Sequence, residues 1–82
     1  MPHITLSQAQ AVCTSLSTLN IAGIFGTQVR IVNINTTSTV WMHNDTVYML
    51  VEFSNGDESE HEFSSLDSFL KSCLDSFLKS FK

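Results

Sequence analysis

The side chains that most often ligate metals or act as nucleophiles are few and widely spaced in this sequence. The histidines are His3, His43 and His61, and the cysteines are Cys13 and Cys73. None of them has a paired spacing such as His-x-x-x-His or Cys-x-x-Cys, which zinc sites and redox pairs use. No glycine-rich phosphate loop occurs either. The sequence therefore predicts no metal site, no cofactor and no catalytic residue identified by its spacing.

One enzymatic interpretation comes from the first four residues, Met1-Pro2-His3-Ile4. This opening resembles that of the tautomerase superfamily, whose members use an N-terminal proline exposed by loss of the methionine. The resemblance implies that Pro2 acts as a base, because an apolar pocket lowers the pKa of a secondary amine. That family also binds its acid substrates with arginines, whereas Arg30 is the only arginine here. A small proline-based tautomerase is therefore the alternative function.

The chain is acidic, with a formal net charge of −4. Its only cations are Arg30, Lys71, Lys79 and Lys82. A nucleic-acid-binding protein needs a basic track to displace counterions, so we expect no direct nucleic-acid binding. A protein partner with a basic surface fits this charge better. Because no apolar run reaches the length of a membrane span and two cysteines make no disulfide framework, we expect a cytoplasmic protein with reduced thiols.

The length of 82 residues, 43% of them hydrophobic, predicts a single domain over residues 1–82. Its first helix is predicted from about residue 7 to residue 20. Ser7 and Gln10 form a capping-box pattern, and apolar residues follow at helical spacing. Glycines then interrupt the chain. We expect the apolar residues of this connection to pack against the core: Ile21, Ile24 and Phe25.

A second helix is predicted near the C-terminus, within Phe63 to Lys82, where an eight-residue pattern occurs twice. Eight residues at roughly 100° each advance the apolar stripe by about 80°, so the second copy points away from the first. In one interpretation the last turns curl over the edge of the core. In the other, the overhanging residues form a self-association contact, most simply a two-fold dimer. These residues are Phe77, Leu78 and Phe81.

Between the helices the sequence predicts four strands. The first, over residues 27–35, has an alternation that slips between Ile31 and Val32. This slip predicts either a β-bulge or a strand covered on both sides. A polar loop is expected over residues 35–38.

The next two strands, Thr39–His43 and Thr46–Phe53, are expected to join through a tight primed turn at Asn44-Asp45. This turn places Val40 opposite Met49 on one face of the sheet. On the other face it places Trp41 opposite Tyr48.

The last hairpin has two possible registers. A loop of only two residues would bury Glu58, Glu60 and Glu62 among apolar side chains, at a prohibitive cost. A three-residue loop with Gly56 in the left-handed position turns these glutamates to the opposite face. The second register is therefore predicted, with Ser59, His61 and Phe63 on the inner face.

These elements predict an α+β fold, a two-layer sandwich in the order α-β-β-β-β-α. Its sheet is a four-stranded antiparallel meander. The N-terminal and C-terminal helices both lie on the face that carries Val47, Met49 and Val51.

The opposite face of the sheet is the predicted partner-binding surface. Aromatic side chains supply stiff contact area, and carboxylates select a basic partner. In a purely structural interpretation, the aromatic pair stabilises the sheet and the glutamates keep an edge strand soluble. The residues of this surface are Trp41, Tyr48, Leu50, Glu52, Glu58, Glu60 and Glu62.

The architecture also suggests a kind of function. Small acidic proteins of similar element order that block a larger target are familiar among viral inhibitors of host defence, anti-CRISPR proteins included. This similarity is one of architecture only. We therefore expect a non-enzymatic protein-binding module, a small inhibitor or regulator.

Overall fold

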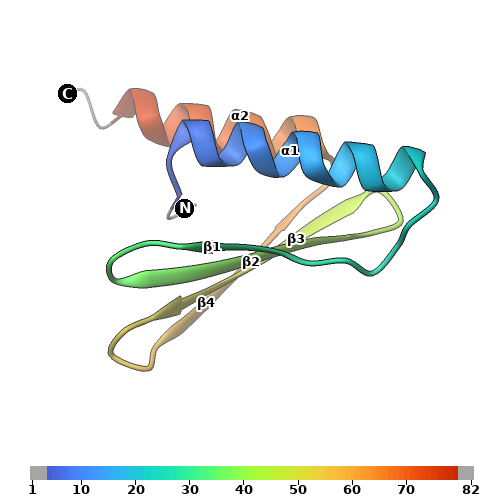
Figure 1. Ribbon diagram of the computed structural model, residues 1–82. Helices are drawn as coiled ribbons and strands as arrows, with labels where there is room; N and C mark the ends of the chain where they lie inside the picture. Colours follow the sequence, from blue (N-terminus) through green and yellow to red (C-terminus); the bar gives the residue numbers. More distant parts are fainter. Residues whose placement is uncertain (1–3, 80–82) are drawn as a thin grey trace.

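The helices and strands of the computed structural model form two layers (Figure 1). The structure describes residues 4–79. Its sheet is antiparallel, with the strands in the order β1-β2-β3-β4. The α+β fold predicted from the sequence is confirmed. In chain order the elements are α1 (Leu6–Ile21), β1 (Val29–Val32), β2 (Thr36–His43), β3 (Thr46–Phe53), β4 (Glu58–Phe63) and α2 (Leu66–Lys79).

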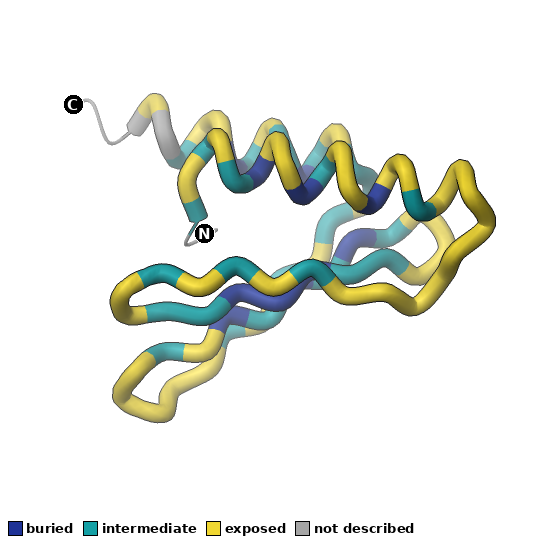
Figure 2. The backbone as a smooth tube through the Cα atoms, viewed as in Figure 1, coloured by how far each residue is buried: buried dark blue, intermediate teal, exposed yellow. Residues whose placement is uncertain are grey.

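Both helices lie on the same face of the sheet, where α1 contacts β1 and β2, and α2 contacts β3 and β4. One stripe of each helix meets alternate residues of the strands, and this is where the core forms (Figure 2). The predicted inner face is therefore correct. Its buried hydrophobic residues are Ala9, Val12, Leu16, Val40, Val47, Met49, Val51, Phe69 and Cys73.

Helix α1 begins one residue earlier than predicted, because a different capping box starts it. The Thr5 side chain accepts a hydrogen bond from the Gln8 backbone at 3.1 Å, and the Gln8 side chain accepts one from the Thr5 backbone at 3.0 Å. The expected pair, Ser7 and Gln10, lies inside the helix instead. Both pairs match the capping-box pattern, and the earlier one satisfies the first free backbone donors of the helix.

The prediction for the first strand was wrong in its length and in its bulge. Strand β1 runs only from Val29 to Val32 and pairs with β2 in an uninterrupted register. Val32 is 70% exposed and Ile34 is 97% exposed, so the strand is not covered on both sides. The apparent slip in the alternation arises because the strand ends at Val32 and the chain then turns, earlier than the predicted end at residue 35. Residues 36–38, expected in a polar loop, belong to β2.

The connection between α1 and β1 also differs from the prediction. Ile21, Ile24 and Phe25 are 87%, 51% and 77% exposed, and none of them is packed in the core. Gly23 and Gly26 have positive φ values of 75° and 82°. Such backbone conformations favour glycine, and they turn this connection away from the sheet.

The two remaining hairpins follow the predicted registers. Trp41 pairs with Tyr48 across the turn at Asn44, whose φ of 57° is the positive value that primed turns require. In the last hairpin Gly56 has a φ of 94°, and Met49 pairs with His61. Ser59 and His61 are half-buried on the inner face, whereas the three glutamates of β4 are exposed. The three-residue loop is therefore confirmed.

At the start of helix α2 the Ser65 hydroxyl accepts a hydrogen bond from the Ser68 backbone at 3.1 Å. Its first apolar repeat is anchored by Phe69, which is 0% exposed. In the second repeat Leu74 is 39% and Leu78 is 53% exposed. The side chain of Phe77 and all of Phe81 lie outside the described part of the chain. The self-association contact therefore stays a prediction.

Candidate functional site

The sheet face that the helices leave uncovered carries a pair of stacked aromatic rings. Trp41 and Tyr48 are cross-strand partners on β2 and β3, and both are half-buried. Their ring centroids are 5.8 Å apart, with an angle of 17° between the ring planes. Offset stacking of this kind fixes both rings, because neither can rotate without losing contact with the other. The pair forms a stiff aromatic surface close to the β2–β3 turn.

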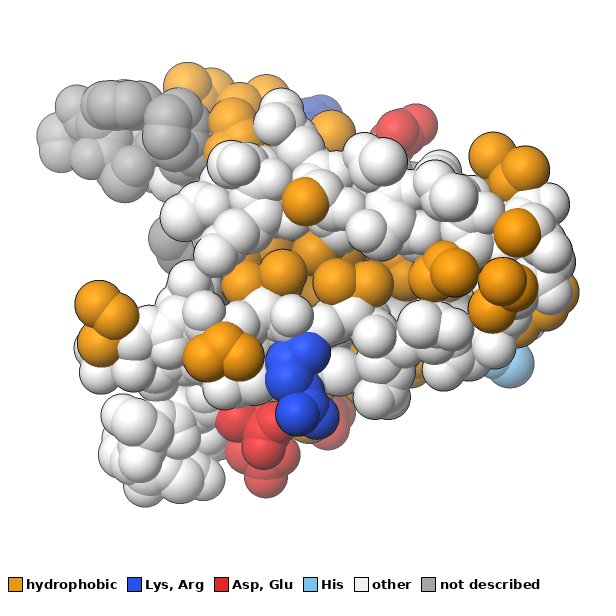
Figure 3. All heavy atoms as spheres, viewed as in Figure 1, with side chains coloured by type: hydrophobic (Ala, Val, Ile, Leu, Met, Phe, Trp, Pro, Cys, Tyr) orange, Lys and Arg blue, Asp and Glu red, His pale blue; other side chains and the backbone are white. Residues whose placement is uncertain are grey.

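The carboxylates of this face lie in register beside the aromatic pair. Tyr48 pairs with Glu62, Leu50 pairs with Glu60, and Glu52 pairs with Glu58. All four of these glutamates are exposed. In Figure 3 acidic side chains gather on the side of the sheet that faces away from the helices. We call Glu52, Glu58, Glu60 and Glu62 the acidic edge.

The acidic edge places like charges next to one another without a cation on either strand. Glu52 and Glu58 are directly opposite each other, and such like-charged pairs destabilise a sheet. Neither β3 nor β4 contains a lysine or arginine. The nearest basic residue on the sheet is Arg30 on β1, which pairs with Thr39. The face is therefore negatively charged over β3 and β4. Arg30 lies on β1, at the opposite edge of the sheet from β4.

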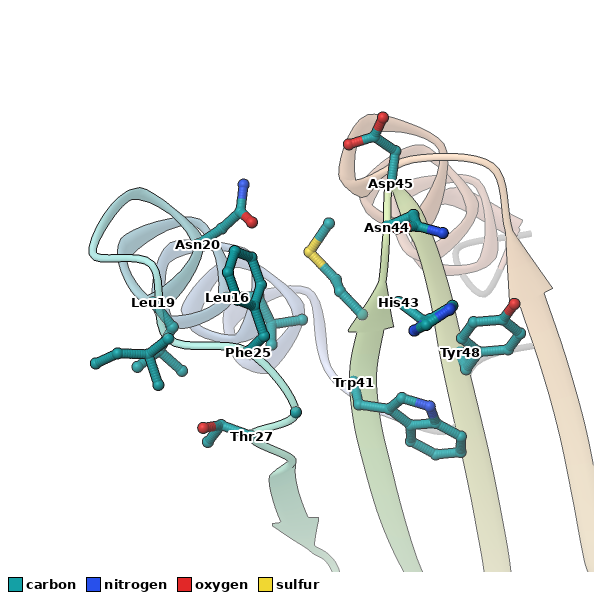
Figure 4. A pocket seen from close by; sticks show the side chains of 13 residues that line it. Leu16, Leu19, Asn20, Phe25, Thr27, Trp41, His43, Asn44, Asp45 and Tyr48 are labelled. Carbon is teal, nitrogen blue, oxygen red and sulfur yellow. The ribbon is translucent and has the colours of Figure 1, made fainter.

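A groove adjoins the aromatic pair. It has a volume of about 790 Å³ and opens between the end of α1 with its following connection and the end of the β2–β3 hairpin. Figure 4 shows Leu16, Leu19 and Phe25 on one side of this groove, and Trp41 and Tyr48 on the other. The aromatic pair thus belongs both to the uncovered sheet face and to the wall of the groove.

All seven predicted site residues lie on one face of the sheet, as the sequence predicts. The groove is not predicted from the sequence, because Ile24 and Phe25 were expected in the core. The available signal was the pair of glycines, Gly23 and Gly26, that enclose these apolar residues. Two glycines so close together allow a connection to leave the core surface.

His43 is exposed and lines the groove, whereas the other histidine and cysteine side chains over residues 4–79 lie in the covered layer. Ser59 Oγ and His61 Nε2 are 3.0 Å apart on the inner face of β4, and neither lines the groove. Burial raises the pKa of the Cys13 thiol, and Asp67 raises it further. Burial likewise raises the pKa of Cys73 to about 11, with a further contribution from Cys13. Both thiols are thus protonated and poorly nucleophilic at neutral pH.

Over residues 4–79 no three potential ligand side chains cluster in a way that could hold a metal ion. Neither helix in this part of the chain combines the length and the apolar composition that a bilayer crossing demands. Pro2, the residue on which the tautomerase resemblance depends, lies outside the described residues.

Comparison with known proteins adds no relative. No protein-family model matches the chain, and searches of the curated proteins and of the solved structures find no match either.

Proposed function

We propose that this protein is a non-enzymatic binding module that takes a protein partner with a basic surface. The contact surface is the uncovered sheet face, formed by the stacked pair Trp41 and Tyr48, by Leu50, and by the acidic edge. The observation that carries the proposal is the arrangement of the acidic edge, in which Glu52 faces Glu58 and Glu62 lies beside the aromatic pair.

This arrangement is poorly explained by stability alone. Charged residues on an edge strand protect it against pairing with other chains, and that role accounts for the glutamates of β4. It does not account for Glu52, because β3 is an inner strand that is paired on both sides. A lysine at either position 52 or position 58 would form a favourable cross-strand pair. A basic partner relieves the repulsion that the chain by itself retains.

The aromatic pair supplies rigid contact area, which the carboxylates do not provide. A rigid aromatic surface gives contact area at a low entropy cost, and a guanidinium or ammonium group gains attraction when it lies over a ring. Carboxylates around it speed the approach of a basic partner and exclude acidic ones. The proposed module acts as a small inhibitor or regulator, in keeping with its architecture. Cys13 and Cys73, both free thiols, support a reducing cytoplasmic setting.

The experiment compares two double charge reversals that change the net charge equally. Glu58→Lys with Glu62→Lys alters the acidic edge, and Asp67→Lys with Asp75→Lys alters exposed positions on α2. Binding of a short oligo-arginine peptide is measured by titration at low and moderate salt, and partners are captured from the native host and identified by mass spectrometry. The sheet variant should bind the peptide at least about tenfold more weakly, and the helix variant within about twofold.

The same variants separate binding from stability. Glu58→Lys removes the repulsion with Glu52, so urea unfolding should show the sheet variant to be no less stable than the wild type. If both variants lost peptide binding equally, the loss would depend on net charge alone and not on the position of the glutamates. That result would contradict the proposal.

Self-association is a separate part of the proposed behaviour. Leu78 is exposed on the last turns of α2, and we propose that it contributes to a two-fold dimer contact. Sedimentation velocity at high micromolar concentration should show a dimer for the wild type and a shift towards the monomer for Leu78→Ser. A wild type that sediments as a monomer would contradict this contact.

A further inference from the structure

Strand β2 continues beyond its neighbour β1 at the end of the sheet that borders the groove. The pairing of these strands ends where Val29 lies opposite Val40. β2 extends three residues further, to His43, and β3 pairs with it along this whole length. On the side of β1, the last three residues of β2 therefore form a free strand edge.

Two hydrogen bonds determine which backbone groups point to that free edge. The Asn33 N–H donates to the Thr36 carbonyl at 2.8 Å, on the β1 side of β2. The Ser54 N–H donates to the Asn35 carbonyl at 3.0 Å, on the β3 side. Because antiparallel strands alternate in the direction of their backbone groups, even-numbered residues of β2 point to β1 and odd-numbered ones to β3. Met42 therefore directs its N–H and its C=O away from β3.

These two groups of Met42 face the groove. Met42 lines it, as do Gly26 and Thr27 from the connection on its far side. Continuing the β1 register would bring Thr27 opposite Met42, but the pairing stops two residues before that point. Within residues 4–79, no hydrogen bond joins this connection to the Met42 backbone. A donor and an acceptor at strand spacing are thus open to an added strand.

The side chains around this edge specify what such a strand would carry. In an antiparallel pair, the residue opposite Met42 directs its side chain to the same face as Met42, towards the apolar wall that contains Leu16 and Leu19. The residues before and after it direct their side chains to the other face, where Trp41 lies. An apolar side chain fits the first position, and a cation over the indole fits the second.

We propose that an extended segment of the basic partner adds to the sheet at this edge, antiparallel to β2, with an apolar residue opposite Met42 and a basic residue beside Trp41. This inference rests on the proposed function, because charge selects the occupant. The charged group that lines the groove is Asp45, and the acidic edge continues along the same sheet face as Trp41. A second copy of the chain would bring another Asp45 and another acidic edge to the contact, so self-pairing is disfavoured.

The first experiment uses three capped heptapeptides that alternate arginine with leucine. One is unmodified, one is N-methylated at its leucines, and one is N-methylated at its arginines. In the proposed geometry the leucine N–H groups bond to β2, and the arginine N–H groups face solvent. Binding is followed by the fluorescence of Trp41, the only tryptophan of the chain. Methylation of the leucines should weaken binding by at least about tenfold, and methylation of the arginines by less than about twofold.

The second experiment measures the accessibility of backbone amides at the same strand edge of the protein. Hydrogen exchange of backbone amides should show fast exchange at Met42 and slow exchange at Trp41 in the free chain, because only the Trp41 N–H is bonded to β3. The unmodified peptide should slow exchange at Met42 and leave Trp41 unchanged. Protection of Met42 that rises with protein concentration in the absence of peptide would assign the edge to a second copy and overturn the proposal.

The outcomes separate this inference from the proposed function. Suppose the unmodified peptide binds, Glu58→Lys with Glu62→Lys weakens it, and leucine methylation has no effect. The sheet face then binds basic partners, but strand addition is overturned. If neither the charge reversals nor the methylation of the leucines weakens peptide binding, both proposals are overturned.

Discussion

Two neighbouring residues of β3, Tyr48 and Met49, lie on opposite faces of the sheet and have opposite surroundings. Met49 is 1% exposed and lies between Val40 and His61 under the helices. Tyr48 lies between Trp41 and Glu62 on the face that no helix covers. One strand thus contributes alternate residues to the core and to the candidate binding surface.

The comparison shows how an 82-residue chain can separate stability from recognition. Residues of the inner face contribute by burial, and their removal costs free energy of unfolding. Most residues of the outer face are less buried, so they can carry charge and half-buried rings without loss of the fold. Substitutions on the two faces should therefore affect different measurements.

The largest difference is expected between an aromatic residue in the core and one on the outer face. Phe69 is 0% exposed and meets Phe63 in an edge-to-face contact with ring centroids 5.2 Å apart. Phe69→Ala should lower the free energy of unfolding by about 3–5 kcal/mol. Trp41→Ala should lower it by less, because the indole is only half-buried: the loss is about 0.5–1.5 kcal/mol for the aromatic pair, together with the contribution of the part of its surface that is buried. The same variant should abolish binding of the arginine–leucine peptide. Urea unfolding measures the first effect. Isothermal titration calorimetry measures peptide binding, because Trp41→Ala removes the only tryptophan of the chain.

If Trp41→Ala destabilised the chain as much as Phe69→Ala, the outer pair would belong to the core. The division between the faces would then be wrong. Tyr48→Phe provides a mild control, because it keeps the ring stack and removes only the hydroxyl group.

The next effect concerns the thiols of the helical layer and appears as a dependence on pH. Folding raises the pKa of Cys73 from its usual value of 9.0 to about 11. The folded state therefore keeps its proton where the unfolded state loses it, so the stability present below pH 9 should fall as the pH rises towards 11. Urea unfolding at several pH values measures this slope.

Cys73→Ala isolates the contribution of this thiol. The variant should be less stable at neutral pH because of the cavity it leaves, yet its stability should decline less steeply above pH 9. Other groups that titrate in this range are the same in both proteins. Parallel slopes for variant and wild type would show that Cys73 does not titrate differently on folding.

The smallest effect sharpens the comparison at a fully buried polar residue of the inner face. Ser38 is 0% exposed on the inner face, and its hydroxyl finds no hydrogen-bond partner among the described residues. Ser38→Ala removes this unpaired group and should raise the free energy of unfolding by up to about 1 kcal/mol. Ser59→Ala is the matched control, since its hydroxyl contacts His61 at 3.0 Å, and it should lower stability slightly. Thermal unfolding compares the two, and a loss of stability for Ser38→Ala would reveal a partner for the hydroxyl.

The sequence predicts the fold wherever a wrong choice would be costly. Burying the glutamates of β4 is prohibitive, so the register of the last hairpin could be derived. The helices follow from apolar periodicity in the same way. For Val32 and Phe25 no such penalty exists, because a single exposed hydrophobic residue costs a small chain little. Their exposure, and therefore the groove, depends on where the chain turns, which Gly23 and Gly26 leave open.

The arrangement of the two helices has a practical consequence for how the molecule can be held. The first turn of α1 and the last turn of α2 lie at the same end of the helical layer, on the left in Figure 1. The β2–β3 turn and the connection that follows α1 lie at the other end. A tether attached through either terminal helix therefore leaves from the end remote from the groove. Immobilised on a sensor surface in this way, the protein would present its free strand edge to the solution.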